Sequence, residues 1–376
     1  MSRTEAVEGS EISALFAESG AAALAEKMPF IIPTDPDWLG QSEFAEKIKP
    51  DQVIFSLPPG SLDSAESLAR CQALRSGGFH CALHVESAGT IARIPPDAFD
   101  YLTFDAAFLH HRLPGADLIH AARSGFRKIA RGASSHEIFT GLSGKGIELC
   151  DSSFLTVPNP DAGKEPDLTR LKLLKLLSLI AQDADTRSIE EIFREDPKLS
   201  YNLLRLVNSV SVGAKTSIDS FHQAIAILGR RQLQRWLQLL IYANQLSHSG
   251  EPNPLMQLAA ARGRQMELLL AAVEPAIDIE AFGDTAFMTG IFSLLNILLN
   301  LPMQEILDAL PLQKTMRDAL NSRQGLLGDL LGAIIAGESG DFPLAVQMLS
   351  QNGISPLAHA TAQTAALFWA SGINLD

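Results

Sequence analysis

Short apolar runs alternate with helix-forming segments through the first 160 residues, and this alternation limits the fold more than any other feature. The runs are apolar on consecutive residues, as in strands that are buried on both faces of a sheet. One intervening helix signal, at residues 61–76, begins with a hydroxyl side chain and ends at two glycines. Repeated strand–helix units predict a parallel sheet of the α/β barrel type. The expected strands are Met28–Ile32, Gln52–Leu57, Phe79–Val85, Tyr101–Phe104, Phe126–Ala130 and Ser153–Val157.

The pattern changes at residues 158–163, where two prolines, an asparagine and a glycine interrupt it. Only about six or seven strands precede this break, so we expect an incomplete barrel rather than a closed one of eight strands. After the break, apolar residues repeat with helical spacing. We therefore predict an α/β domain at residues 1–160 and an all-helical domain at residues 165–376. Expected helices include Leu233–Leu246, Pro254–Ala272, Thr285–Asn300 and Leu357–Ala370, with Gly229 ending an earlier helix and Trp236 and Trp369 in the core.

The charge of the chain narrows the classes of partner. Its 376 residues carry a formal net charge of −13, and both halves are acidic. We therefore expect no binding to nucleic acid or to anionic lipid. The three cysteines lack paired spacing, which is typical of reduced thiols. No apolar segment is long enough to span a bilayer, and charged residues interrupt the N-terminus, so we expect a cytoplasmic protein without membrane insertion.

Several segments of the helical half follow a recognisable pattern. They are Ile192–Leu199, Leu203–Ser209, Ile218–Ile225, Leu228–Gly229, Arg235–Leu237, Ala286–Leu295 and Leu310–Leu312. Together they resemble the HDOD domain, and the likeness covers most of residues 165–345. HDOD domains are related to HD phosphohydrolases, in which a His-Asp pair on a helix binds metal. Thr289 and Gly290 stand at the corresponding positions here, so the resemblance implies that this metal pair is missing.

The first half follows a second pattern, in consistent order along the chain. Its segments are Phe30–Pro33, Val53–Leu57, Gly78–Glu86, Asp100–Asp105, Ala130–Ser135 and Cys150–Ser152. They resemble the strands of EAL-type cyclic di-GMP phosphodiesterases, so the whole chain resembles bacterial EAL–HDOD proteins with a degenerate EAL-like barrel. Active members carry metal-binding or catalytic side chains at these strand ends. The positions that correspond to them here are Ile32, Phe55, His84, Val85, Thr103, Asp105, Arg131 and Ser134.

The chemistry of these replacements argues against catalysis. Mg²⁺ and Mn²⁺ bind carboxylate and amide oxygens, which isoleucine, phenylalanine and valine lack. Two-metal hydrolysis needs several converging carboxylates, and only Asp105 remains of the set that the resemblance implies. We therefore expect no catalytic residue, no metal site, no cofactor and no enzymatic activity. We also expect Ile32 and Phe55 to be packed rather than to line an open polar cleft.

Five arginines form the densest cationic group of the chain: Arg230, Arg231, Arg235, Arg262 and Arg264. One interpretation makes them, together with Asn208, an interaction patch for a phosphate or an acidic partner. The interpretation that we favour pairs them with acidic residues of neighbouring helices, such as Glu267, which lies three residues after Arg264. Asn208 is equally well explained as a residue that bonds to local backbone at a helix end.

Our leading hypothesis is a non-enzymatic bacterial signalling or regulatory protein that binds other proteins. The resemblance implies a setting of cyclic di-GMP signalling, two-component regulation or motility. One alternative is a sensor that binds cyclic di-GMP or another nucleotide without cutting it, although this ligand is not favoured. A second alternative is an active phosphodiesterase with relocated metal ligands. Protein partnership would require an exposed apolar patch, and a homo-oligomer could use the same patch.

Overall fold

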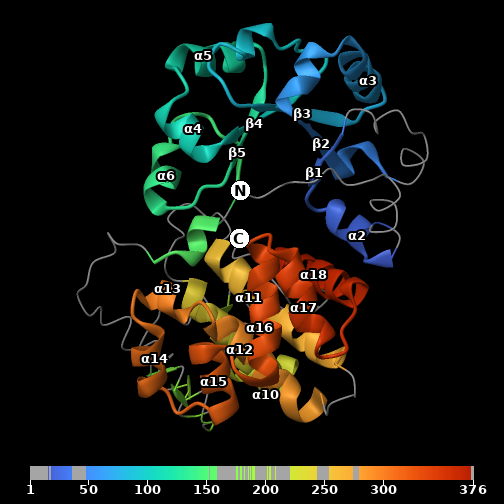
Figure 1. Cartoon of the computed structure of the whole chain (residues 1–376). Helices are drawn as coiled ribbons and strands as arrows, with labels where there is room; N and C mark the ends of the chain where they lie inside the picture. The colour runs from blue at the N-terminus through green and yellow to red at the C-terminus, as the bar shows by residue number, and fades with distance from the viewer. Residues whose placement is uncertain are drawn as a thin grey trace. The chain divides into compact units, whose positions relative to one another are not determined.

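The computed structural model describes residues 18–35, 48–151, 153–158, 221–243, 254–273 and 279–373, together with Phe16 and isolated positions between 175 and 208. The chain divides into two compact units, Met1–Val157 and Pro158–Asp376. Each unit is described by itself below (Figure 1). The domain bounds expected from the sequence, 1–160 and 165–376, stay a prediction. Within the described ranges, every helix is too short or too polar to span a bilayer.

The described part of the first unit contains a six-stranded parallel sheet whose strands follow the order of the chain. This order, with helices between strands, is the topology of an incomplete (β/α) barrel, a half-barrel. Five of the six expected strands are confirmed, each to within two residues at either end. The strands are β1 (Phe30–Pro33), β2 (Val53–Leu57), β3 (His80–Val85), β4 (Tyr101–Asp105), β5 (Arg127–Arg131) and β6 (Leu149–Cys150).

Helices and short 3₁₀ turns connect these strands and lie on the outer side of the curved sheet (Figure 1). The cap of α3 is Ser64, whose side chain accepts a hydrogen bond from the Ser67 amide, and the helix ends at Gly77 as predicted. The helices are α2 (Ala21–Ala25), α3 (Ala65–Ser76), α4 (Ala106–His111), α5 (Gly115–Arg123) and α6 (His136–Gly141). The 3₁₀ turns are η2 (Pro50–Gln52), η3 (Pro59–Asp63), η4 (Ile91–Arg93) and η5 (Ser153–Thr156).

The expected strand Ser153–Val157 is wrong, because this segment forms the turn η5 and the last strand is β6. Asp151 explains the change of direction. Its carboxylate accepts hydrogen bonds from the backbone amides of Gly132 and Ala133 and from the Ser153 hydroxyl. Such local side-chain bonds compete with sheet hydrogen bonds. Two apolar residues of this segment, Phe154 and Leu155, are buried all the same, and Phe154 stacks on Phe139 of α6.

The sheet has two distinct faces, since successive residues of a strand point to opposite sides. We call the side that packs on the helices the helix face; on it, the buried Cys81 lies beside the buried Cys71 of α3. The opposite side, the inner face, carries a buried apolar cluster at its centre. The cluster consists of Ile54, Ala82, Tyr101 and Ile129. Polar and charged residues occupy the two ends of the inner face, where strands begin and end.

In the second unit, the described residues form helices and no strand, as predicted. Helix α11 packs against both α12 and α18. Trp236 is buried and stacks on the half-buried Trp369, with ring centroids 5.7 Å apart. The helices are α10 (Phe221–Ala243), α11 (Pro254–Ala271), α12 (Ile279–Phe292), α13 (Leu295–Leu299), α14 (Met303–Ala309), α15 (Lys314–Ser322), α16 (Gly325–Glu338), α17 (Phe342–Ser350) and α18 (Pro356–Ser371).

Two helix boundaries in this unit show how local residues interrupt a helical pattern. Gly229 has φ 76° and breaks α10 at the position where the sequence predicted a helix end. The single helix expected at Thr285–Asn300 is wrong, because the chain forms α12 and α13 with a break between them. At this break the Ser293 hydroxyl donates to the Gly290 carbonyl and accepts a hydrogen bond from Arg262. A tertiary contact therefore stabilises the interruption.

One buried histidine makes the stability of this unit dependent on pH. His359 of α18 lies beside Gly337, and its Nε2 has no hydrogen-bond partner among the described residues. Burial lowers the pKa of His359 below its ordinary value of 6.5. The unfolded chain therefore binds this proton more readily than the folded chain. It follows that the free energy of unfolding should fall as the pH drops below about 6.5 towards the folded-state pKa.

Replacing His359 with leucine should reduce this acid-dependent loss of stability. The measurement is the free energy of unfolding of the full chain from urea titrations at about pH 7.5 and about pH 5.5. His120, which is exposed on α5, supplies the matched control: His120→Leu should leave the difference between the two pH values unchanged. An equal difference in wild type and His359→Leu would contradict the prediction.

Candidate functional site

The carboxyl ends of the strands meet at one edge of the sheet, which is where α/β barrels place their active sites. The register divides the eight predicted site positions between two faces. Ile32, Phe55 and Val85 lie on the helix face. Four others share the inner face: His84, Thr103, Asp105 and Arg131. The eighth position, Ser134, is exposed and lies in the segment after β5.

The apolar replacements are packed away from the inner face. Ile32 and Phe55 are direct partners across β1 and β2, and both are buried, as the sequence led us to expect. Their side chains nevertheless point towards the helices, so they do not fill the interior of the half-barrel. Ile54 and Ser56 are the residues of β2 on the inner face. The family resemblance did not predict the face on which Ile32 and Phe55 lie, because a shift of one residue exchanges the two faces of a strand.

A small polar group occupies the carboxyl-end rim of the inner face. His84 Nδ1 lies 3.1 Å from the Thr103 hydroxyl, and its Nε2 lies 3.8 Å from Glu86. Burial is the largest influence on the imidazole and lowers the pKa of His84, with a further lowering by the nearby Arg131. The neighbouring carboxylates, Glu86 above all, act in the opposite direction. The rim therefore combines one imidazole, one guanidinium and a few carboxylates.

Asp105, the carboxylate that matches the family pattern, serves the local fold. Its Oδ1 accepts a hydrogen bond of 2.9 Å from the Phe108 amide and so caps the first turn of α4. Arg131 lies directly opposite Asp105 in the register of β4 and β5. Side chains at such paired positions on one face are close neighbours. Arg131 therefore shares the inner face with Asp105 and starts from the adjacent position of the next strand.

The residues present do not fit the divalent-metal site that the resemblance implies. In the part of the chain that the structure describes, no three or more His, Cys, Asp or Glu side chains are arranged to hold a metal ion. At the rim itself, the positive charge of Arg131 opposes a second cation near Asp105. Thr103, where the family pattern has a lysine, is fully buried on the inner face.

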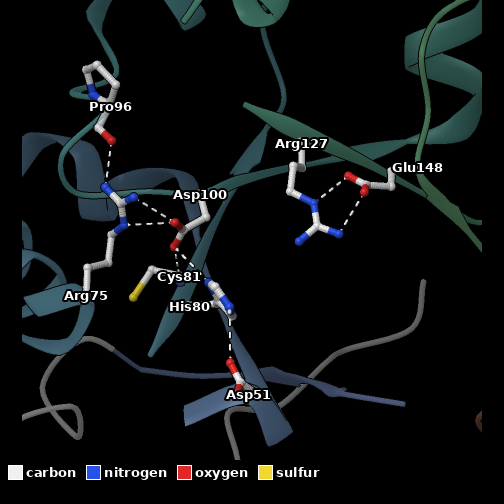
Figure 2. Close-up of polar contacts among 8 residues, drawn as sticks. All are labelled: Asp51, Arg75, His80, Cys81, Pro96, Asp100, Arg127 and Glu148. Atoms are coloured by element: carbon white, nitrogen blue, oxygen red, sulfur yellow. Dashed lines mark hydrogen bonds and ion pairs between the residues drawn. The ribbon is translucent and has the colours of Figure 1, made fainter. Parts of the chain in front are cut away.

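A second polar cluster lies at the opposite edge, at the amino ends of β3 and β4. Figure 2 shows Arg75 of α3 donating to Asp100 Oδ1 from Nε and Nη2, at 3.0 and 2.7 Å, and from Nη1 to the Pro96 carbonyl. The other oxygen of Asp100 accepts a hydrogen bond from the Cys81 amide and lies 3.5 Å from His80 Nδ1. These hydrogen bonds connect α3 to the amino ends of β3 and β4. In a barrel, this edge contributes stability rather than catalysis.

The same edge carries a second ion pair, also drawn in Figure 2. Arg127 donates to both oxygens of Glu148, at 2.6 and 2.7 Å, and this pairing lowers the pKa of Glu148. The guanidinium also lies over the Tyr101 ring, 4.5 Å from its centroid. Our sequence analysis did not identify Arg75, Asp100 or Arg127, because their partners lie far away in sequence and no local spacing pattern marks them.

In the helical unit, four arginines of the predicted interaction patch are paired with acidic residues, three of them with residues of other helices and Arg264 with a residue of its own helix. Arg235 binds Glu267 at 2.5 Å and Asp284 at 2.8 Å, and it lies over the Phe287 ring. The other pairs are Arg231 with Asp284, Arg264 with Glu267, and Arg262 with Glu338. For Arg230 the side chain lies outside the described residues. Asn208 donates to the Leu204 carbonyl.

Arg262 is a correction to the predicted patch. Only 4% of its side chain is exposed, so it belongs to the interior and not to a surface that meets a partner. Its guanidinium donates to both oxygens of Glu338 and to the Ser293 hydroxyl, which joins α11 to α16 and to the end of α12. Whether the remaining residues form an interaction patch stays a prediction.

The positions that correspond to the His-Asp pair lie in a close helix contact. Thr289 is fully buried, and its hydroxyl donates to the Thr285 carbonyl of the same helix. A Cβ atom at Gly290 would lie 2.6 Å from the Arg262 carbonyl oxygen and 2.7 Å from the Gly263 Cα. Helices α11 and α12 therefore touch backbone to backbone at this point. Gly290 has no room for any side chain, and so none for an aspartate.

A pocket of about 430 Å³ lies among four helices of the same unit. Its volume is within the range of small-molecule sites. Leu270 of α11, Phe282 of α12 and Leu327 of α16 supply apolar walls, and the polar groups come from α15 and its junction with α16. The remaining lining residues are Thr315, Asp318, Gln324, Gly325 and Leu326.

Comparison with known proteins identifies the helical region. Residues 169–318 match the HDOD domain family. This part of the chain is an HDOD domain. Its match includes α11, α12 and the close contact at Gly290, and it ends within α15. The likeness of the first unit to the EAL family stays a prediction.

Two curated relatives share part of this chain. Cyclic di-GMP phosphodiesterase CdgJ of Vibrio cholerae is 34% identical over 149 residues, which is 40% of this chain and 33% of CdgJ. The uncharacterized protein YuxH of Bacillus subtilis is 24% identical over 212 residues, which is 55% of this chain and 50% of YuxH. The alignments thus span between a third and a half of the length of these relatives.

One solved structure is also similar. It is a putative phosphohydrolase from Shewanella amazonensis, with 16% sequence identity and a TM-score of 0.35, and the match covers 55% of this chain and 93% of that one. At this TM-score the likeness supports no conclusion about fold or function.

Proposed function

We propose that this chain is a non-enzymatic bacterial signalling protein that acts by binding other proteins. In this proposal, its first unit is a degenerate EAL-like half-barrel and its HDOD domain is the docking module. The observation that carries the proposal is the state of Asp105. Its carboxylate caps α4 and lies opposite Arg131, so the one acidic side chain retained from the family pattern is committed to the local fold.

The helical unit supports the same proposal. An HD-type hydrolase needs a His-Asp pair at a helix position with space for both side chains and a metal. At Gly290 the backbones of α11 and α12 are in direct contact, so a side chain there would collide with main-chain atoms of Arg262 and Gly263. The HDOD domain therefore favours a role in recognition over one in hydrolysis.

The relatives suggest the biological setting. An HDOD domain together with a relative that is named a cyclic di-GMP phosphodiesterase favours a place in cyclic di-GMP signalling. CdgJ is the protein that carries the activity in its name, and this chain matches only a third of it. Signalling through a bound partner, rather than nucleotide hydrolysis, is the role that we propose here.

Incubation of the full chain with cyclic di-GMP and either Mg²⁺ or Mn²⁺ tests the absence of catalysis. We expect no linear product above the protein-free rate in chromatography of the mixture. If product forms, Asp105→Asn distinguishes its source. Turnover that disappears in Asp105→Asn would establish the phosphodiesterase alternative and overturn our proposal, whereas turnover that persists in this variant would indicate a contaminating enzyme.

Isothermal titration with cyclic di-GMP separates the proposal from the sensor alternative. We expect no binding at micromolar nucleotide, because the cationic side chain that we identify among the described residues of the rim is Arg131, and it lies opposite Asp105 in the register. Heat that saturates at one nucleotide per chain, and that is lost in Arg131→Gln, would favour the sensor.

Affinity capture tests for a protein partner. With the full chain as bait, it should enrich a specific protein that an unrelated acidic bait does not enrich.

A further inference from the structure

The pocket among α11, α12, α15 and α16 has no part in the function proposed above. Its volume of about 430 Å³ suits a small organic molecule. The described residues that line it all belong to the helical unit, and they combine apolar walls with a few polar groups. This is the usual composition of a ligand site, and the chemistry of the polar groups indicates which class of ligand fits.

Apolar side chains form the walls of the pocket. Leu270 of α11 and Leu327 of α16 are buried, and Leu326 is half-buried. Phe282 of α12 is 49% exposed, so its ring is not covered by the core of the unit. Burial of apolar ligand surface against such walls contributes roughly 25 cal/mol per Å². The walls therefore favour a ligand with an apolar body.

Among the described lining residues, the charged side chain is that of Asp318 in α15. Its Oδ2 accepts a hydrogen bond of 2.6 Å from Lys314, whose side chain is 88% exposed. An ion pair with so exposed a member contributes little free energy. In the part of the chain that the structure describes, the Oδ1 atom accepts no hydrogen bond. Asp318 therefore keeps one carboxylate oxygen for a donor group of a ligand.

The ring of Phe282 is a second group that attracts positive charge. An ammonium group over an aromatic face is stabilised by the electrons of the ring, and a hydrogen bond from an ammonium to a carboxylate is stronger than one between neutral groups. The described lining residues include no lysine, arginine or histidine that would repel such a group. A carboxylate and an aromatic ring in an apolar pocket are together suited to recognise an amine.

We propose that this pocket binds a small amine with an apolar body, and that Asp318 binds its ammonium group. The competing ligand is an anion, because three residues of the first turn of α16, Gly325 to Leu327, also line the pocket. The positive end of a helix is equivalent to about half an elementary charge, whereas a carboxylate carries a full one. The charge balance of the lining therefore favours a cation, and the net charge of −13 acts in the same direction.

Isothermal titration of the full chain with three probes tests this site. Hexylammonium, hexanoate and hexanol share one apolar chain and differ in the charge of the polar end. We expect hexylammonium to bind at one molecule per chain, at least about 10-fold more tightly than the other two, because only its ammonium forms a charge-assisted hydrogen bond with Asp318.

Two pairs of variants locate the binding. Asp318→Asn should weaken hexylammonium binding by about 10-fold or more. Lys314→Gln breaks the same surface ion pair but keeps the carboxylate, so it should bind the probe as tightly as wild type or more tightly. Thr315→Trp places a large ring at the pocket and should abolish binding, whereas Thr361→Trp, at an exposed position of α18 outside the lining, should not.

Four results would overturn the proposal. One is a wild-type chain that does not bind hexylammonium at millimolar concentration, and another is hexanol binding as tightly as hexylammonium. Tighter binding of hexanoate would assign the pocket to an anion at the positive end of α16. Equal losses in Asp318→Asn and Lys314→Gln would show that the ion pair supports the structure and that the carboxylate does not contact the probe.

Discussion

Gly290→Ala should lower the free energy of unfolding of the helical unit by about 3 kcal/mol or more. The added methyl group would lie 2.6 Å from the Arg262 carbonyl oxygen, and 2.7 Å from both the Arg262 carbonyl carbon and the Gly263 Cα. All three are backbone atoms, so no side-chain rotation can relieve the collision. Helices α11 and α12 would have to separate, and this contact lies in the core of the unit.

Urea unfolding followed by circular dichroism measures the loss, with Gly337→Ala as the matched control. Gly337 is also buried within a helix of this unit, but a methyl group there would meet only the His359 ring, at an ordinary distance of 3.5 Å. Alanine forms helices better than glycine does, so the control should be neutral or slightly more stable. If Gly290→Ala were as stable as Gly337→Ala, the close helix contact would be refuted.

Glu338→Gln should destabilise the same unit by about 3 kcal/mol, because it leaves the buried guanidinium of Arg262 without a counter-charge. Arg262 binds Glu338 through hydrogen bonds of 2.6 and 2.8 Å and is nearly inaccessible to water. The surroundings increase the cost. Burial and the nearby charge of Arg262 lower the pKa of Arg323, so without Glu338 two cations would remain close together.

The free energy of unfolding from urea titration again provides the measurement. Lys314→Gln is the control, since the pair Lys314–Asp318 is largely exposed and should contribute less than about 1 kcal/mol. The double variant Arg262→Met with Glu338→Leu should lose less than Glu338→Gln alone, because it removes both buried charges. A loss in Glu338→Gln as small as that of the control would show that the ion pair does not stabilise the core.

The strands of the first unit illustrate what local pattern can reveal. Runs such as Gln52–Leu57 and Phe79–Val85 are mostly apolar and include consecutive apolar residues. Strands β2 and β3 occupy almost the same residues as these runs. Burial of a strand on both faces leaves this mark in the sequence. The run Ser153–Val157 carries the same mark but forms a turn, because Asp151 binds the backbone of Gly132, which lies 19 residues earlier in the chain.

The site positions show where local pattern fails. The sequence placed Ile32, Phe55, His84 and Asp105 at one eroded rim, but the register puts the first two on the opposite face of the sheet. Residue type and order do not specify register, since a shift of one residue reverses every side chain. The surroundings of the arginines also depend on the tertiary structure. Their acidic partners could be suspected from composition, but the burial of Arg262 follows only from the packing of three helices.

The sequence alone determined the change from strand–helix alternation to helices near residue 160 and the HDOD pattern. These are properties of periodicity and composition, which the chain carries without folding. Only the tertiary structure decided which strand residues share a face, that Asp105 lies beside Arg131, and that α11 and α12 meet backbone to backbone at Gly290. Each of these depends on contacts between residues far apart in the chain, and such contacts exist only when the whole core is packed.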